Sequence, residues 1–107
     1  MKIHWSQTAL DNLTAEAEFI ASERPLASRQ WEKQIREAAA RAGRFPWSGR
    51  RLPEAPDLGL REFVVAGYRM VYLPDADQVV IVGVRHRSLP LDRVALGIHA
   101  SDADDED

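Results

Sequence analysis

The hydrophobic pattern between Leu60 and Arg87 predicts three consecutive β-strands. Runs rich in β-branched and aromatic residues cover Leu60–Val65, Tyr68–Leu73 and Gln78–His86. Ala66-Gly67 separates the first two runs, and Gly67 can adopt the positive φ that a tight hairpin requires. Pro74 to Asp77 supplies turn-forming residues between the second and third runs. This order predicts an antiparallel meander, in which each strand pairs with the one before it.

The residues before the meander predict one strand and two helices. Lys2 to Trp5 alternates polar and apolar side chains, which is typical of a short strand at a sheet edge. Ser6 is a predicted N-cap for a helix that runs to about Ser22. Pro25 fits the first turn of a second helix, which runs to about Ala42 and which Gly43 is expected to end.

The predicted fold class is therefore α+β. We expect an N-terminal strand, a two-helix hairpin packed on a small antiparallel β-sheet, and a short C-terminal helix from Leu91 to Ile98. The length predicts a single domain, residues 1–100, followed by a disordered acidic tail, residues 101–107. The side chains expected to be buried together are those of Leu13, Ile20, Trp31, Ile35, Val71 and Val82.

A proline- and glycine-rich connection, residues 44–59, joins the helices to the meander. It is long for a loop without secondary structure in a small domain, and such loops are often functional. We expect Phe45 and Trp47 to anchor its start against the core. Arg50, Arg51 and Glu54 would then be presented beside the sheet.

The net charge of −3 conceals a mildly basic folded part. Five of the 17 acidic residues lie in the tail, and without them 14 basic residues face 12 acidic ones. Only Lys2 and Lys33 are lysines; the other cations are arginines. Arginines recur in and just after the predicted strands, at Arg61, Arg69, Arg85 and Arg87. They predict either a solvated sheet face or a cationic surface for phosphate or an acidic protein.

Several kinds of chemistry find no support in the sequence. The chain has no cysteine, so disulfides and thiolate metal sites are impossible, and its three histidines lack metal-ligand spacing. No glycine-rich phosphate loop or nucleophile elbow occurs, so no cofactor and no metal site are expected. The N-terminus lacks a signal-peptide pattern and no run is long enough to span a bilayer, so we expect a cytoplasmic protein with no membrane partner.

Over residues 2–93 the order of elements resembles that of the RelE/ParE superfamily, the toxins of type II toxin–antitoxin modules. Local motifs carry the resemblance: Ile3-x-Trp5-Ser6 before Ala9-x-x-Asn12-Leu13, Gly49 to Glu54, Leu60 to Phe63, Gly67 to Tyr72, and Val84 to Arg87. The resemblance implies a cognate antitoxin of the ParD/RelB kind as a partner. It also implies one of two targets. ParE-like members inhibit DNA gyrase without catalytic residues, whereas RelE- and YoeB-like members cleave messenger RNA on the ribosome.

We favour the ParE-like branch. The folded part is only mildly basic and nearly free of lysine, whereas a protein that binds in the ribosomal A site should be strongly cationic. The tyrosine that the YoeB-like pattern places after the last strand is missing, because Ser88 and Leu89 stand there. For this branch, Arg61, Arg69, Arg85 and Arg87 are the candidate target-binding residues.

The nuclease alternative implies catalytic roles for three residues. By motif position, Glu54 would be the general base, Arg69 would stabilise the phosphate, and His86 would be the general acid. A purely structural role is also open, in which Glu54 pairs with Arg51 or Arg61. A third possibility is a non-toxic interaction module. The sequence therefore leaves open whether the protein is an enzyme.

Overall fold

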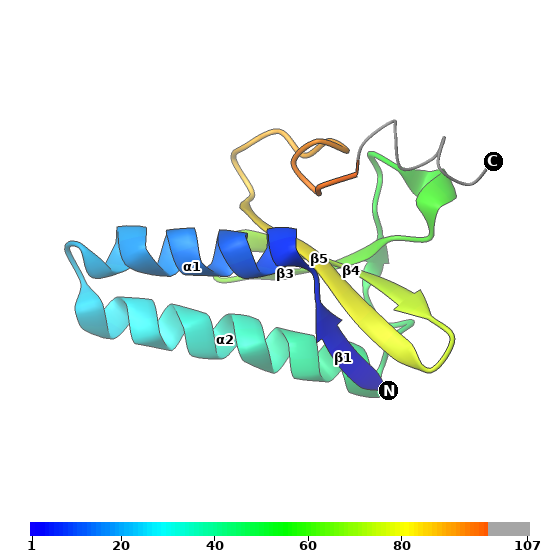
Figure 1. Ribbon diagram of the computed structural model, residues 1–107, viewed down its shortest axis with the longest axis horizontal. Coiled ribbons are helices and arrows are strands. Elements are labelled where there is room, and N and C mark those ends of the chain that lie inside the picture. The colour runs from blue at the N-terminus through cyan, green and yellow to red at the C-terminus, as the bar shows by residue number, and fades with distance from the viewer. Residues whose placement is uncertain (99–107) are drawn as a thin grey trace.

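The computed structural model describes residues 1–98, which form two helices on one face of a five-stranded sheet (Figure 1). The helices are α1 (Gln7–Ala21) and α2 (Pro25–Arg44), and a short 3₁₀ turn, η1, covers Pro56–Leu58. The strands are β1 (Lys2–Trp5), β2 (Arg50–Arg51), β3 (Arg61–Val65), β4 (Tyr68–Asp75) and β5 (Gln78–His86). None of these helices is both long and apolar enough to span a membrane.

The sheet has the strand order β1-β5-β4-β3-β2 and is mixed. The predicted meander is confirmed, since β3, β4 and β5 pair antiparallel in sequence order. β1 lies at the predicted edge but pairs parallel with β5, so the expectation of a wholly antiparallel sheet is wrong at this strand. The reason is the hairpin: α1 and α2 carry the chain away and back, which leaves β1 and β5 pointing the same way (Figure 1).

The helix boundaries follow local chemistry. The Ser6 hydroxyl accepts a hydrogen bond from the Ala9 amide at 3.1 Å, which caps α1 as predicted. α2 runs to Arg44, two residues further than expected, and Gly43 lies inside it rather than ending it. A Cβ on Gly43 would lie only 3.0 Å from the Ile3 side chain, so this glycine serves close packing of α2 on β1.

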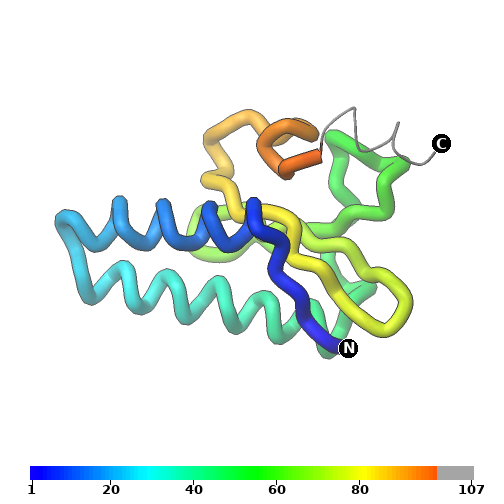
Figure 2. Tube along the Cα trace, viewed as in Figure 1, coloured from blue at the N-terminus to red at the C-terminus, as the bar shows by residue number. Residues whose placement is uncertain are grey.

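Two separate apolar clusters cover the two faces of the sheet. On the helix face, Leu13, Trp31 and Ile35 pack against β4 and β5, with Ile20 half-buried beside them. On the opposite face, here called the loop face, segments 52–60 and 91–98 cover the sheet (Figure 2). Val71 and Val82 pack in this second cluster, so the expectation of one common core is wrong for these two residues. Val71 stands between Met70 and Tyr72 on β4, and alternate side chains of a strand point to opposite faces.

Two further expectations are corrected. No helix forms at Leu91–Ile98, because these residues make a turn closed by hydrogen bonds such as Ile98 N to Arg93 O at 2.8 Å. Phe45 and Trp47 are 58% and 65% exposed and do not anchor the loop. The Tyr72 hydroxyl does so instead, because it accepts from the Gly49 amide at 3.0 Å and donates to the Pro46 carbonyl at 2.9 Å.

The loop-face cluster should behave as a true second core. Leu52 is 1% exposed, and truncation of a buried leucine to alanine costs about 2–5 kcal/mol of unfolding free energy. We expect Leu52→Ala to fall in this range in urea denaturation. Val94→Ala is the control, since Val94 is 72% exposed on the same face, and it should change stability by less than about 0.5 kcal/mol. Equal effects of the two substitutions would contradict a buried second core.

Candidate functional site

An ion network on the loop face joins three segments of the chain, and its centre is Glu62 of β3. The Glu62 side chain is only 1% exposed, so its carboxylate needs charged partners. Arg69 of β4 donates from Nε to Glu62 Oε1 at 2.6 Å. Arg50 of β2 donates from Nε to Glu62 Oε2 at 3.0 Å. The network therefore pins the two-residue strand β2 to the sheet.

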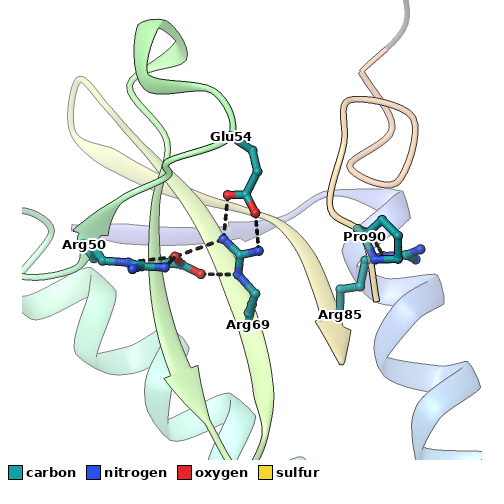
Figure 3. Close-up of polar contacts among 6 residues, drawn as sticks. Arg50, Glu54, Arg69, Arg85 and Pro90 are labelled. Atoms are coloured by element: carbon teal, nitrogen blue, oxygen red, sulfur yellow. Dashed lines mark hydrogen bonds and ion pairs between the residues drawn. The ribbon is translucent and has the colours of Figure 1, made fainter. Parts of the chain in front are cut away.

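Arg69 extends this network to Glu54. Its Nη1 and Nη2 donate to the two carboxylate oxygens of Glu54 at 2.5 and 2.7 Å, in a bidentate pair that Figure 3 shows. The Arg69 side chain is 11% exposed and that of Glu54 is 39% exposed. Arg69 is thus enclosed by two carboxylates, one buried and one facing solvent. Glu54 does form an ion pair, as its purely structural role requires. Its partner is Arg69 and not Arg51 or Arg61, which the sequence suggested.

The network changes the proton affinity of both carboxylates. Hydrogen bonds from Arg69 hold the pKa of Glu54 below its usual value, despite partial burial. Burial alone would raise the pKa of Glu62, but hydrogen bonds from Arg69 and Arg50 outweigh it and the pKa is lowered. The two carboxylates in turn raise the pKa of Arg69. Glu54, Glu62 and Arg69 are therefore charged at neutral pH, and Glu54 is a weaker base than a free glutamate.

His86 lies on the other side of the sheet from this network. The register pairs Tyr68 with His86 and Arg69 with Arg85. The His86 ring packs edge-on against Tyr68 of the helix-face core, with ring centroids 5.0 Å apart, and its Nδ1 is 2.6 Å from Ser88 Oγ. Burial and a hydrogen bond to Glu16 raise the pKa of Tyr68 to about 12. The structure thus brings Glu54 and Arg69 together but does not bring His86 to them.

The other candidate arginines are divided between the two faces. Arg61 lies on the helix face, donates to the Gly49 carbonyl at 2.8 Å and stacks over Trp47 at 5.3 Å. Arg85 shares the loop face with Arg69 and donates to the Pro90 carbonyl (Figure 3). Arg87 follows the end of β5 and is exposed. The four arginines therefore form no single continuous cluster.

Sequence reasoning missed Glu62 and Arg50 as members of the site. A signal for Glu62 was present, because Leu60, Glu62 and Val64 alternate on one face and a carboxylate among apolar neighbours must find a cation. Nothing in the sequence indicated which arginine that would be. Among residues 1–98, no group of three or more histidine or carboxylate side chains could hold a metal ion.

Two solved structures share this fold. The solved structure "Chromosomal ParDE TA system from P. aeruginosa" shares the fold at TM-score 0.68 and 14% identity, covering 80% of this chain and 95% of that one. The "YoeB/ParE toxin from Agrobacterium tumefaciens" matches at TM-score 0.58 and 19% identity, covering 81% and 99%. No curated protein matches the chain.

The chain is a member of the RelE/ParE superfamily of toxins. A match between its sequence and a family model identifies the branch. The family model described as "ParE toxin of type II toxin-antitoxin system, parDE" matches residues 3–89, and the chain belongs to this family.

The buried carboxylate provides a direct test of the network. Glu62→Gln keeps the shape but removes the charge, and hydrogen bonds to charged groups contribute about 1.5–3 kcal/mol each. We expect a loss of that order in unfolding free energy at pH 7. Glu18→Gln on the exposed face of α1 is the control and should have little effect.

The stabilisation that Glu62 provides should depend on pH. Because the pKa of Glu62 is lower in the folded state than the ordinary value of 4.5, its contribution is present above that value and is lost as pH falls through the folded-state pKa. Denaturation of the wild type and Glu62→Gln from pH 7 to pH 3 should show the two stabilities converging in acid. A constant difference across this range would contradict the ion network.

Proposed function

We propose that this protein is the toxin of a type II toxin–antitoxin module and arrests growth by inhibiting DNA gyrase. A cognate antitoxin of the ParD/RelB kind would neutralise it, and the cytoplasm, where gyrase acts, would be its place of action. Membership of the ParE toxin family supports the toxin class. The observation that most favours gyrase over RNA cleavage is the placement of His86 across the sheet from Glu54 and Arg69.

The chemistry of RNA cleavage explains why this placement matters. Attack of a ribose 2′-hydroxyl on the adjacent phosphorus requires a base, a cation for the phosphate and an acid for the leaving oxygen, all around one phosphate. Here the lone pairs of Glu54 are engaged by Arg69, and Arg69 is shared with Glu62. The candidate acid faces the helix-side core. An inhibitor that acts by binding alone needs none of these groups to converge.

Binding to a large target would depend on exposed cations. Arg87 is exposed beyond β5, and the Arg50 side chain is 64% exposed although it contacts Glu62. Arginines of this kind attract the anionic surface of a DNA-bound enzyme and set the rate of association. Arg61 and Arg69 have intramolecular partners, so we infer that they shape this surface as much as they contact the target.

One observation favours the nuclease alternative. Glu54 and Arg69 are in direct contact, as a base and a phosphate-binding cation would need to be. An RNA phosphate could replace the Glu54 carboxylate on Arg69 and release Glu54 to accept a proton. The acid would still have to come from another group or from the ribosome.

Two assays with the purified protein distinguish the targets. One follows DNA supercoiling and cleavage-complex formation by gyrase, and the other follows cleavage of messenger RNA on translating ribosomes. We expect gyrase to be inhibited, messenger RNA to stay intact, and Glu54→Gln and His86→Gln to inhibit gyrase like the wild type. Ribosomal cleavage that either substitution abolishes, with gyrase unaffected, would overturn the gyrase assignment.

The arginines offer a matched pair of variants. Arg87→Glu reverses an exposed charge next to the sheet, and Arg29→Glu makes the same charge change on the exposed face of α2. We expect gyrase inhibition to weaken about tenfold, or roughly 1.4 kcal/mol, for Arg87→Glu only.

Expression without antitoxin should also arrest growth. Unimpeded growth at confirmed expression would favour a non-toxic interaction module.

A further inference from the structure

The ladder between β2 and β3 contains one matched and one unmatched pair of charged side chains. Residues directly opposite each other in an antiparallel pair lie on the same face of the sheet. On the loop face, Arg50 is opposite Glu62 and the two form an ion pair. On the helix face, Arg51 is opposite Arg61, and like charges in such positions destabilise a sheet. Within residues 1–98 neither of these two arginines forms an ion pair. No described carboxylate therefore neutralises this pair of cations.

Arg61 is fixed in place but keeps donors for another group. Its Nη1 donates to the Trp47 carbonyl at 3.1 Å and to the Gly49 carbonyl at 2.8 Å. In the described part of the chain, its Nε and Nη2 make no hydrogen bond. A guanidinium held through one nitrogen loses little conformational freedom when an anion binds the others. Arg61 is thus prepared to bind an anion that comes from outside the chain.

An exposed indole lies beside this cation. The Arg61 guanidinium lies over the Trp47 ring, 5.3 Å from its centroid, and Trp47 is 65% exposed. The main chain on both sides of Trp47 is held by the Tyr72 hydroxyl, which bonds to the Pro46 carbonyl and the Gly49 amide. With Arg61 over one face of the ring, this degree of exposure leaves much of the rest of the indole in contact with solvent. The ring is therefore held at the surface by a fixed loop.

A second aromatic side chain is exposed in the same turn. Phe45 is 58% exposed and lies two residues before Trp47. Neither residue belongs to the apolar cluster on either face of the sheet, so the fold does not use them for its core. Single exposed apolar residues are common, but a group of them indicates a binding surface. We call the surface formed by Phe45, Trp47, Arg51 and Arg61 the Trp47 patch.

We propose that the Trp47 patch binds a single strand of nucleic acid. One base would stack on the Trp47 indole, and the phosphates beside it would contact Arg51 and the free nitrogens of Arg61. Proteins that bind single strands combine these two elements, cations for the backbone and exposed aromatic rings for the bases. Stacking does not depend on the identity of the base, because every base has a π-face. The patch therefore fits an unpaired strand of any sequence.

Other occupants would use only part of this surface. An acidic peptide would satisfy the two arginines but has no ring that matches the flat indole. Duplex DNA offers phosphates, but its bases are stacked on one another and closed to Trp47. A second copy of this chain would bring the same two cations toward each other, where like charges repel. A single strand is the chemistry that uses the indole and the unmatched arginines together.

This inference goes beyond the proposed function, because it adds a direct contact with nucleic acid to the inhibition of an enzyme that acts on DNA. The patch lies on the helix face, across the sheet from Glu54 and Arg69. Binding of a strand here is measured without gyrase, ribosomes or antitoxin. Failure of the two proposals can therefore be told apart.

Binding of labelled oligonucleotides tests the patch directly. Fluorescence anisotropy with a thymidine oligonucleotide of about 12 nucleotides, and with the uridine RNA of the same length, covers the expected site size. At about 50 mM salt we expect one or both to bind and to quench tryptophan emission, and the tighter of the two identifies the source of the strand. A duplex of equal length should bind at least about fivefold more weakly, although its charge density is higher.

Substitutions of Trp47 separate stacking from other effects. Trp47→Leu removes the ring and should weaken binding at least about fivefold, the lower limit for one stacked base. Trp47→Phe keeps an aromatic face, so it should bind within about threefold of the wild type but lose most of the quenching. Phe19→Leu is the matched control, since Phe19 is 76% exposed on α1, and it should change neither signal.

The phosphate contacts have a separate readout. Each phosphate bound in a single strand contributes about 0.7 to the slope of log affinity against log salt. Between about 50 and 200 mM salt we expect Arg51→Gln to lower this slope by about that amount. Arg29→Gln removes the same charge from an exposed position of α2 and should leave the slope unchanged. Circular dichroism verifies that each variant is folded.

Four outcomes would overturn the inference. They are no binding of either oligonucleotide to the wild type, equal affinity for single strand and duplex, full affinity in Trp47→Leu, and an equal loss in Phe19→Leu. Polyglutamate that binds the patch where oligonucleotides do not would assign the surface to an acidic protein instead. None of these results would change the gyrase assay, and loss of gyrase inhibition with intact oligonucleotide binding would refute only the proposed function.

Discussion

The contact between Arg69 and the buried Glu62 carboxylate is the constraint on which the loop face depends. A carboxylate at 1% exposure in the middle of a sheet is tolerable only with a cation beside it, and Arg69 lies one strand away. The same guanidinium reaches Glu54, while Glu62 also holds Arg50. These three ion pairs, together with the Tyr72 hydroxyl at the start of the loop, fix the position of the loop that follows α2. Such buried pairs contribute more to a unique arrangement than to net stability, because desolvation offsets much of their attraction.

This arrangement has a functional side. A loop held by ion pairs presents its exposed groups in a defined place. The cation that holds it, Arg69, is already paired with Glu54 and Glu62. Arg69 therefore becomes available to another anion only when its ion pair with Glu54 breaks. The exposed arginines outside the network have no such restriction, and the sheet displays them on both of its faces. These features agree better with a protein that recognises a surface than with one that assembles three catalytic groups.

The sequence predicted the strands, the helix hairpin and the family because each depends on local periodicity or on motif order. Trp31 and Ile35 follow helical spacing, and Gly67 has the positive φ, 81°, that the tight turn required of it. Ala66 also has a positive φ, 52°, which its residue type did not indicate. Other features depend on contacts between distant residues. The parallel pairing of β1, the second core beneath Val71 and the choice of Arg69 as partner of Glu54 all require knowledge of which segments meet. The turn at Leu91–Ile98 is a local error, because the apolar spacing indicated a helix where the chain makes only a turn that closes at Gly97, with φ 73°.

The pairing of β1 with β5 has a consequence for the timing of folding. Lys2 pairs with Gln78, so β1 has no strand partner until β5 has been synthesised. Contacts of such long sequence separation form late and slow the folding of small domains. The helix hairpin can form early, but the sheet is complete only after β5 has been synthesised. A nascent chain of this kind stays without its finished sheet until β5 has formed, and a binding partner already present in the cell could meet the protein as that surface first forms.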